Sequence, residues 1–173
     1  NLPRLYSLAS GRRDGFIEIV VRKQPGGLCS GQLLALEPGQ AIRAFVRSNP
    51  AFHPEPGRAP LILIGAGTGI GALAGFIRAN RRNRPIHLFF GMRHPRSDFL
   101  YAEELSGWQG DGRLARLTTA ISRGARPHYV QDALRAEGGG VARLIRNGCR
   151  VMVCGGRGIG GAAGKRAGGG GGI

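Results

Sequence analysis

The sequence contains no apolar run that approaches the ~18–20 residues needed to cross a bilayer, and no secretory signal segment is visible in it. Its three cysteines form neither a C-x-x-C pair nor a disulfide framework, which suits a reducing, cytoplasmic compartment. Its four histidines are scattered without metal-ligand spacing, so we expect no metal site. Lysine is nearly absent and aromatic residues make up only 6% of the chain, which argues against a base-stacking surface and so against nucleic-acid binding.

Arginine dominates the charged residues that are present. The 173 residues carry a formal charge of +15, and 42% of them are hydrophobic, as in a packed globular protein. The charge has two interpretations that composition leaves open: an arginine-rich surface without a specific partner, or a surface for an anionic cofactor or an acidic protein. The chain begins at Asn1 rather than Met, directly before motif-like sequence, so we expect it to belong to a longer protein.

A glycine-rich turn lies between a short apolar strand and a helical pattern. Leu61–Ile64 lead into Gly-Ala-Gly-Thr-Gly, and Gly67, Gly69 and Ala72 meet the Gly-x-Gly-x-x-Gly/Ala spacing. Such a turn at a helix N-terminus presents backbone N–H groups and the positive end of the helix dipole, which favour a phosphate or pyrophosphate. Small residues at this place also allow close helix–strand packing without any ligand, so the turn alone leaves both interpretations open.

No acidic residue lies between Pro56 and Ser97. A turn that binds NAD or FAD generally has an Asp or Glu about 20 residues further on, which holds the ribose 2′-hydroxyl. This window carries arginines instead: Arg78, Arg81, Arg82, Arg84, Arg93 and Arg96. A dinucleotide with an additional phosphate on its ribose matches that charge better, so the sequence favours NADP over NAD.

From Leu61 onwards the chain alternates between strand and helix patterns. The patterns predict strands over 61–64, 86–90, 114–120 and 150–154. They predict helices over 73–82, 99–107 and 129–147, the last one broken at Gly138–Gly140. Regular alternation with short links predicts a doubly wound α/β fold with a parallel sheet.

The first 57 residues follow a different pattern. Segments rich in β-formers predict three strands: Leu5–Leu8, Phe16–Arg22 and Ala41–Arg47. A glycine turn leads into a short helix within Gly26–Leu36, and a proline cluster predicts a linker after it. We therefore expect two domains, 1–57 and 58–173, with a glycine-rich tail without regular structure at 155–173.

Two polar motifs lie in this first region. Arg4, Tyr6 and Ser7 occupy one predicted strand, where alternation places Arg4 and Tyr6 on the same face. From spacing alone, an ordinary edge strand with an ion-pairing arginine is the favoured interpretation. Gly27–Ser30 form a second glycine turn at a helix start, with Ser30 expected as the N-cap. That turn either only caps the helix or forms a second pyrophosphate site.

Further candidates follow the later strands. In an open α/β sheet ligands bind beyond the carboxyl ends of the strands, where an arginine and a hydroxyl can hold a phosphate. The candidates at these ends are Arg93, Ser122, Arg123, Arg126, Tyr129, Gln131, Cys154 and Gly155. Cys154 has an alternative role as an inert buried side chain. Asp98 is expected to cap the helix over 99–107, with Glu103 and Glu104 in its first turns.

In this order, the motifs resemble the ferredoxin–NADP reductase superfamily, and within it the flavoprotein component of sulfite reductase and related NADPH–haemoprotein reductases. The resemblance covers the chain up to about Gly156. It implies a partial antiparallel β-barrel, the FAD domain without its first half, followed by a doubly wound parallel α/β sheet, the NADP domain. It also implies FAD and NADPH as cofactors.

The resemblance assigns residues to each cofactor. Arg4 would hold the FAD pyrophosphate, Tyr6 would cover the flavin ring, and Ser7 would approach flavin N5. The second FAD segment, which binds pyrophosphate through backbone amides and a hydroxyl, comprises Gly27, Leu28, Cys29 and Ser30. The NADP pyrophosphate turn comprises Gly67, Thr68 and Gly69. The residues implied around the 2′-phosphate and adenine are Ser122, Arg123, Tyr129 and Gln131, with Arg126 in place of the family's lysine.

The resemblance also implies a reaction. A hydride would pass from nicotinamide C4 to flavin N5, and single electrons would then pass to an acidic acceptor, a flavodoxin-like FMN domain or a haem protein. Ser7, Cys154 and Glu104 are the implied catalytic residues, with Cys154 beside the nicotinamide as support rather than as a nucleophile. The alternatives are a non-catalytic NADP-binding protein without a competent FAD site, and a basic nucleic-acid-binding domain.

Overall fold

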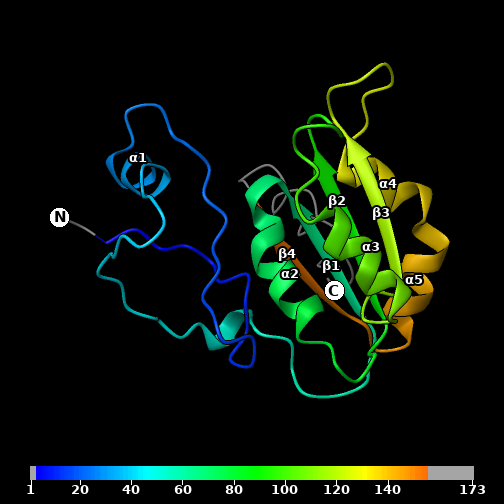
Figure 1. Cartoon of the computed structure of the whole chain (residues 1–173). Coiled ribbons are helices and arrows are strands. Elements are labelled where there is room, and N and C mark those ends of the chain that lie inside the picture. The colour runs from blue at the N-terminus through cyan, green and yellow to red at the C-terminus, as the bar shows by residue number, and fades with distance from the viewer. Residues whose placement is uncertain (1–2, 156–173) are drawn as a thin grey trace, which may run out of the picture.

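The computed structural model describes residues 3–155. They form an irregular N-terminal segment that lies beside an α/β domain (Figure 1). The strands of the domain are β1 (Leu61–Ala66), β2 (Ile86–Met92), β3 (Arg116–Ile121) and β4 (Arg150–Cys154). Their order is β3-β2-β1-β4 and every pair is parallel, which confirms the four predicted strands and the parallel sheet.

Strand β1 is buried on both faces. Leu61 and Leu63 belong to one hydrophobic cluster, and Ile62 and Ile64 belong to the other, on the opposite face of the sheet. A strand covered on both faces has no polar side, which explains why its sequence is a continuous apolar run rather than an alternating one.

Helices cover both faces of the sheet (Figure 1). On one face lie α2 (Ile70–Arg78) and α3 (Ala102–Gly110), which contribute side chains such as Leu73 and Trp108 to the larger cluster. On the other face lie α4 (Val130–Ala136) and α5 (Gly138–Arg146). This arrangement confirms the doubly wound α/β fold expected from the strand–helix alternation.

The break in the predicted helix over 129–147 falls at Glu137, not at the glycines. Gly138–Gly140 form the first turn of α5. The Glu137 carboxylate accepts a hydrogen bond from the Thr118 hydroxyl at 2.8 Å and pairs with Arg116 at 3.1 Å, both on β3. These tertiary contacts, together with the packing of α5 on the sheet, outweigh the low helix propensity of glycine.

Asp98 does not cap α3, so that expectation was wrong. The N-cap is Tyr101, in the left-handed region with φ 61°. Asp98 instead closes the preceding turn, where its carboxylate accepts hydrogen bonds from the His94 N–H at 3.2 Å and the Ser97 hydroxyl at 2.9 Å. Glu103 and Glu104 lie in the first turn of α3, as expected.

The N-terminal segment contains a helix but no strand among residues 3–57. Helix α1 (Leu28–Leu34) confirms the predicted helix, and a short 3₁₀ turn, η1, spans Pro50–Phe52. The β pairing in this segment is a single antiparallel bridge between Leu8 and Ile19. The three predicted strands are therefore wrong as strands, and the partial barrel is not shown.

A strand is stable only when it pairs with neighbours and covers an apolar face. In this segment those partners are not present among the described residues, and large apolar side chains stay exposed: Leu5, Phe16, Ile17, Leu28, Leu34, Ile42, Phe45 and Val46. A β-forming composition alone therefore does not make a sheet.

Ser30 also differs from its predicted role. The N-cap of α1 is Gly27, and Ser30 lies one turn inside the helix. Its hydroxyl donates to the Gly27 carbonyl at 3.3 Å and accepts from the Gln24 N–H at 3.1 Å. Ser30 therefore fastens the glycine turn to the helix from within rather than from the cap position.

The proline-rich link to the sheet is held by Arg84. This buried guanidinium donates to the Glu55 carbonyl at 2.9 Å and also to the Ala59 carbonyl. Asn80 closes the same loop by donating to the Arg84 carbonyl at 2.7 Å and the Arg113 carbonyl at 2.8 Å. The domain boundary between residues 57 and 58 stays a prediction. The predicted glycine-rich tail lies outside the described residues, except for Gly155.

No helix among residues 3–155 is both long and apolar enough to span a membrane. In the same part of the chain, no group of three or more His, Cys, Asp or Glu side chains could hold a metal ion.

A buried and an exposed phenylalanine give a stability prediction with a matched control. Phe90 on β2 is 0% exposed, whereas Phe45 in the N-terminal segment is 68% exposed. We expect Phe90→Ala to lower the free energy of unfolding by about 3–5 kcal/mol, because it removes a buried ring and leaves a cavity. Phe45→Ala should change it by less than about 0.5 kcal/mol. Urea denaturation measures both, and equal losses would contradict this description of the core.

Candidate functional site

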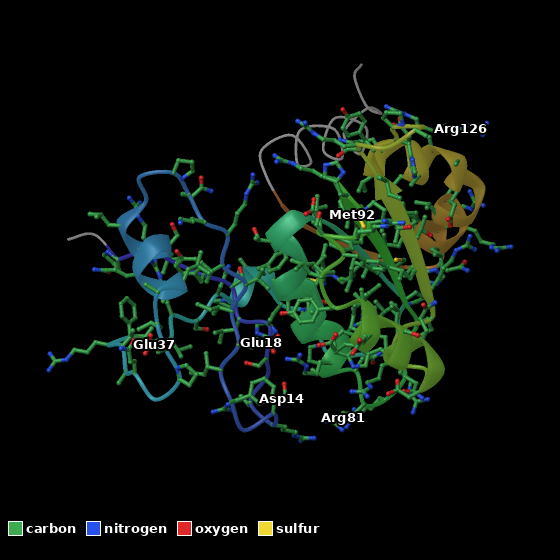
Figure 2. The ribbon with its side chains drawn as sticks, turned by 45° about the horizontal axis from the view of Figure 1, so that its top comes forward. Asp14, Glu18, Glu37, Arg81, Met92 and Arg126 are labelled. Atoms are coloured by element: carbon green, nitrogen blue, oxygen red, sulfur yellow. The ribbon has the colours of Figure 1, made fainter. Side chains whose placement is uncertain are left out.

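The register of the sheet brings four loops to one edge. Gly65 on β1 pairs with Phe90 on β2 and with Cys154 on β4, and Met92 pairs with Ile121 on β3. The chain therefore leaves all four strands at nearly the same level, at their carboxyl ends. Figure 2 labels Met92 and Arg126 at this end of the domain and Arg81 at the opposite end.

The glycine turn is the loop that follows β1. Gly67–Gly69 form a 3₁₀ turn, η2, that continues without interruption into α2 at Ile70. Gly67 has φ 54°, which favours glycine, and the first turn of α2 contains no acidic residue. The positive end of the α2 dipole is therefore not neutralised by a neighbouring carboxylate of that turn.

Glycine is required where the turn meets the end of β4. A Cβ atom on Gly69 would overlap the Cys154 carbonyl, and one on Gly65 would lie 2.7 Å from Leu73 Cδ1. Between β1 and β4 the strand order reverses, because β2 follows on one side of β1 and β4 lies on the other. This reversal is the point where open α/β sheets bind ligands.

The loop after β3 is tied to the loop after β2. The Ser122 N–H donates to the Met92 carbonyl at 2.9 Å, and the Arg123 N–H donates to the Arg93 carbonyl at 3.1 Å. The hydroxyl of Ser122 also donates to the Met92 carbonyl at 3.3 Å. These bonds bring together Ser122, Arg123 and Arg93, which the sequence had placed on two separate strand ends.

The arginines of these loops carry uncompensated charge. Arg93, Arg123 and Arg126 are exposed, and none of them takes part in an ion pair among the described residues. His128 holds the far end of the loop, with its ring Nε2 3.3 Å from the Thr119 carbonyl. The loop after β3 is therefore anchored at both ends, and its exposed guanidinium groups are suited to binding a phosphate.

Tyr129 and Gln131 begin the helix that covers this loop. Tyr129 is the N-cap of α4 and is exposed, and its N–H donates to the Asp132 carboxylate at 2.9 Å. Gln131 lies in the first turn of the same helix. Gly91 lets this helix approach the sheet, because a Cβ there would lie 2.6 Å from Val130 Cγ2. An exposed ring at this position offers a flat surface for a base.

Cys154 lies at the carboxyl end of β4, directly beside the glycine turn. Its side chain is half-buried against the larger cluster, and this burial raises the pKa of the thiol. A thiol with a raised pKa remains protonated near neutral pH and is a poor nucleophile. The three cysteines of the chain are free thiols.

The two motifs of the N-terminal segment lie together. The Tyr6 hydroxyl donates to Cys29 Sγ at 3.7 Å, and this bond raises the pKa of Tyr6. Arg4 and Ser7 on the same segment are exposed. A shallow depression of about 300 Å³ follows the turn beside α1, lined by residues that include Gly26, Gly27 and Leu28. The structure thus brings Arg4–Ser7, which is a loop and not the predicted strand, into contact with the start of α1.

Glu104 lies away from the glycine turn. It is exposed in the first turn of α3, near Tyr101, whose pKa is raised mainly by burial and by the bond to Glu18 and least by Glu104. Tyr101 in turn contacts Glu18, the partner of Arg78 at the last residue of α2, whereas the glycine turn precedes the first residue of α2. A catalytic role for Glu104 stays a prediction that no contact with Cys154 or with the turn supports.

Sequence reasoning did not identify the contacts that join the N-terminal segment to α2 and to Tyr101. Arg78, Glu18 and Tyr101 form a hydrogen-bonded group, and Gly71 and Gly75 lie in contact with the N-terminal segment. The spacing of two glycines four residues apart on α2 was the available signal. Nothing local indicated that Glu18 would meet residues 60 and 83 positions later in the chain.

The fold and the turn together define a dinucleotide-binding domain of the oxidoreductase type. Residues 63–163 match the family described as "Oxidoreductase NAD-binding domain". The chain therefore belongs to this family, which is part of the ferredoxin–NADP reductase superfamily, and the resemblance seen in the sequence is confirmed.

Curated relatives extend the match into the N-terminal segment. The chain is 36% identical to the sulfite reductase [NADPH] flavoprotein alpha-component of Serratia proteamaculans over 169 residues, which cover 88% of this chain and 28% of that protein. It is 35% identical to the protein of the same name from Escherichia coli K12 and 34% identical to that from Salmonella typhi, with the same shares covered. The chain thus spans 28% of the length of these relatives.

The close approach at Gly69 gives a testable prediction. We expect Gly69→Ala to destabilise the protein and to disturb the end of β4, because the added Cβ overlaps the Cys154 carbonyl. Gly107→Ala on α3 is the control, since no atom lies within 4 Å of its Cβ position; alanine there should stabilise the helix by about 0.5–1 kcal/mol. Thermal unfolding of the two variants should shift in opposite directions, and a neutral Gly69→Ala would contradict the packing described.

The burial of Cys154 gives a second prediction. Because burial raises the pKa of this thiol, its thiolate forms at a higher pH in the folded protein than in the unfolded one. The rate of alkylation by iodoacetamide, followed by mass spectrometry, should therefore rise at higher pH in the folded protein than in guanidinium chloride. A midpoint at or below that of the unfolded chain would show that Cys154 is not shielded as described.

Proposed function

We propose that the chain supplies the NADP-binding domain and part of the FAD-binding region of an NADPH-dependent flavoprotein reductase. The observation that carries this proposal is the meeting of three loops at one edge of the sheet: a glycine turn with no acid in the first turn of α2, and the loops after β2 and β3, which carry exposed arginines. A pyrophosphate and a ribose 2′-phosphate are the anionic groups that such a pair of sites fits.

The residues around the turn divide the binding of NADPH between them. Gly67, Thr68 and Gly69 would bind the pyrophosphate through backbone N–H groups, and Gly155 would face it from the end of β4. Ser122, Arg123 and Arg126 would hold the 2′-phosphate, with Arg93 adding positive charge to the same loop. Tyr129 would stack on the adenine, and Gln131 would lie alongside it.

The FAD region fits its cofactor in part. Tyr6 and Cys29 are in contact, so the segment that would cover the flavin and the segment that would hold its pyrophosphate already lie side by side. Arg4, Ser7 and Leu28 are exposed on the same segment. These residues could bind the pyrophosphate and orient the ring, and the remaining walls of a barrel are not among residues 3–57.

When bound, NADPH and FAD supply the redox chemistry, the transfer of a hydride from nicotinamide C4 to flavin N5. The protein must hold the reacting atoms roughly 3–3.5 Å apart and exclude water. Cys154 would support the nicotinamide by contact, since its protonated thiol does not attack it. Ser7 would donate a hydrogen bond near flavin N5. Glu104 would be an acid that acts from the first turn of α3.

The proposed electron acceptor is an acidic protein, either a flavodoxin-like FMN domain or a haem protein, in the same polypeptide or in another. The formal charge of +15 favours association with a negatively charged surface, and such steering weakens as salt is added.

A second candidate function is NADP binding without flavin chemistry. The observation that favours it is the N-terminal segment itself, where β pairing among residues 3–57 is limited to the bridge between Leu8 and Ile19. A protein of this kind would bind NADP at the glycine turn and would not retain FAD.

Flavin content and reduction test the proposal directly. We expect a yellow preparation whose flavin absorbance remains after gel filtration and is bleached by NADPH under anaerobic conditions, and much less by NADH. Colourless protein that still binds NADP would support the second candidate. Salt-sensitive DNA binding without any affinity for NADP would overturn both.

The 2′-phosphate contact is tested by one substitution. Arg123→Ala should weaken NADPH binding by about 1.5–3 kcal/mol, the range for a hydrogen bond to a charged group, and leave NADH binding nearly unchanged. Arg143→Ala on α5 removes the same charge from an exposed position on another helix and serves as the control. Calorimetric titration measures both dinucleotides, and an equal loss for NADPH and NADH would remove Arg123 as the phosphate ligand.

A further inference from the structure

Arg78 joins the N-terminal segment to the α/β domain. Its Nη1 donates to the Ala9 carbonyl at 2.7 Å, and its Nη2 pairs with the Glu18 carboxylate at 3.3 Å. The guanidinium carbon also lies 5.4 Å from the ring centroid of Phe16 and 5.6 Å from that of Trp108. Only 12% of the Arg78 side chain is exposed, so these contacts are largely shielded from water.

Tyr101 completes the group. Its hydroxyl donates to Glu18 Oε1 at 2.6 Å, and burial together with this bond raises the pKa of Tyr101. The residue adopts its left-handed conformation at the start of α3, which is unfavourable for a non-glycine residue. The bond to Glu18 is a physical reason for that conformation. We call Arg78, Glu18 and Tyr101 the Arg78 clamp.

Two glycines of α2 extend this contact towards the glycine turn. A Cβ on Gly71 would lie 2.9 Å from Val20 Cγ2, and one on Gly75 would lie 3.2 Å from the backbone carbon of Ala9. The backbone of Leu8 and Ala9 and the side chain of Val20 therefore pack directly on α2, and Ala9 is fully buried there. Its N–H donates to the Glu18 carbonyl at 2.8 Å, which keeps the two sides of this segment together.

The contact begins two residues from each cofactor motif. Ser7 precedes Ala9 by two positions, and Gly69 precedes Gly71 by two positions. An extended residue spans only about 3.3 Å and a helical one about 1.5 Å. A shift at the clamp therefore moves Arg4–Ser7 relative to Gly67–Gly69 with little chain in between to absorb it.

We propose that Arg78 is a positioning residue for hydride transfer, because the Arg78 clamp sets the place of the flavin segment Arg4–Ser7 relative to the glycine turn Gly67–Gly69. This inference rests on the proposed function. It does not place Arg78 in contact with either cofactor, and it assigns the clamp to alignment rather than to affinity.

The clamp itself is tested by Arg78→Gln, without any cofactor. Loss of the guanidinium should speed amide hydrogen exchange in residues 8–20, measured by mass spectrometry, because Ala9 and Glu18 lose their partner. Arg135→Gln is the control, since Arg135 forms an exposed ion pair with Asp132 within α4. Unchanged exchange in residues 8–20 of Arg78→Gln would overturn the proposal.

The positioning role is tested in the FAD-loaded protein by rapid mixing with NADPH. Arg78→Gln should slow flavin reduction at saturating NADPH by about 10- to 100-fold, the scale of a small misplacement of reacting groups. Its affinity for NADP⁺ should stay within about twofold of wild type, because none of the residues proposed to hold the phosphates belongs to the clamp. A larger isotope effect with 4-deuterated NADPH should accompany the slower step.

A merely structural role predicts a different result. In that case Arg78→Gln would lower the unfolding temperature while the folded fraction reduced its flavin at the wild-type rate, and the positioning role would be overturned. A wild-type protein that NADPH does not reduce would overturn the proposed function and the positioning role with it. Faster exchange in Arg78→Gln would still establish the clamp in that case, so the two failures are distinguishable.

A steric pair provides a rescue experiment. Gly71→Ala should push residues 8–20 away from α2 and slow flavin reduction, because its Cβ meets Val20 Cγ2. The double variant Gly71→Ala with Val20→Ala removes that methyl group and should recover most of the rate. Recovery supports the positioning role, since it restores geometry without restoring any polar contact. A double variant as slow as Gly71→Ala contradicts it.

Discussion

The position of β1 is the constraint on which the rest of the domain depends. Leu61–Ile64 are buried on both faces, and the strand pairs with β2 on one edge and β4 on the other. A strand held on four sides has one permitted register, since a slip by one residue would exchange its two faces. The glycine turn is therefore delivered to the sheet edge at a fixed height, and α2 starts from that point.

Helix α2 makes close contacts with two other parts of the chain through glycines. Its N-cap Gly69 meets the end of β4, whereas Gly71 and Gly75 within the helix meet Val20 and the backbone of Ala9. The arginines divide in a similar way. Arg78 and Arg84 donate hydrogen bonds to backbone carbonyls, and Arg78 also pairs with Glu18. Three other arginines are exposed at the sheet edge: Arg93, Arg123 and Arg126. Part of the positive charge is therefore used within the fold, and another part lies exposed at the sheet edge.

The sequence predicted the α/β domain well because its signals are local. Apolar runs, a glycine turn and alternating periods specify strands and helices whatever lies elsewhere, and four parallel strands followed from them. The N-terminal strands failed because a strand depends on partners that composition does not reveal. Tyr101 could not be anticipated as an N-cap, since its backbone conformation accompanies a bond to Glu18, 83 positions away. The sequence indicated the exposed arginines, but only the sheet shows that the loops after β2 and β3 are joined by backbone hydrogen bonds to Met92 and Arg93.

The glycines at the start of α5 have a consequence for the unfolded chain. Gly138–Gly140 are free to adopt many backbone conformations there, and the helix confines all three without burying any residue fully. The entropy lost on folding must be offset by Val141 and Leu144, which pack on the cluster beneath. No atom lies within 4 Å of the Cβ position of any of these glycines, so side chains could be added without repacking. Replacing these glycines by alanine would therefore raise the free energy of unfolding through a helix other than the one that follows the glycine turn.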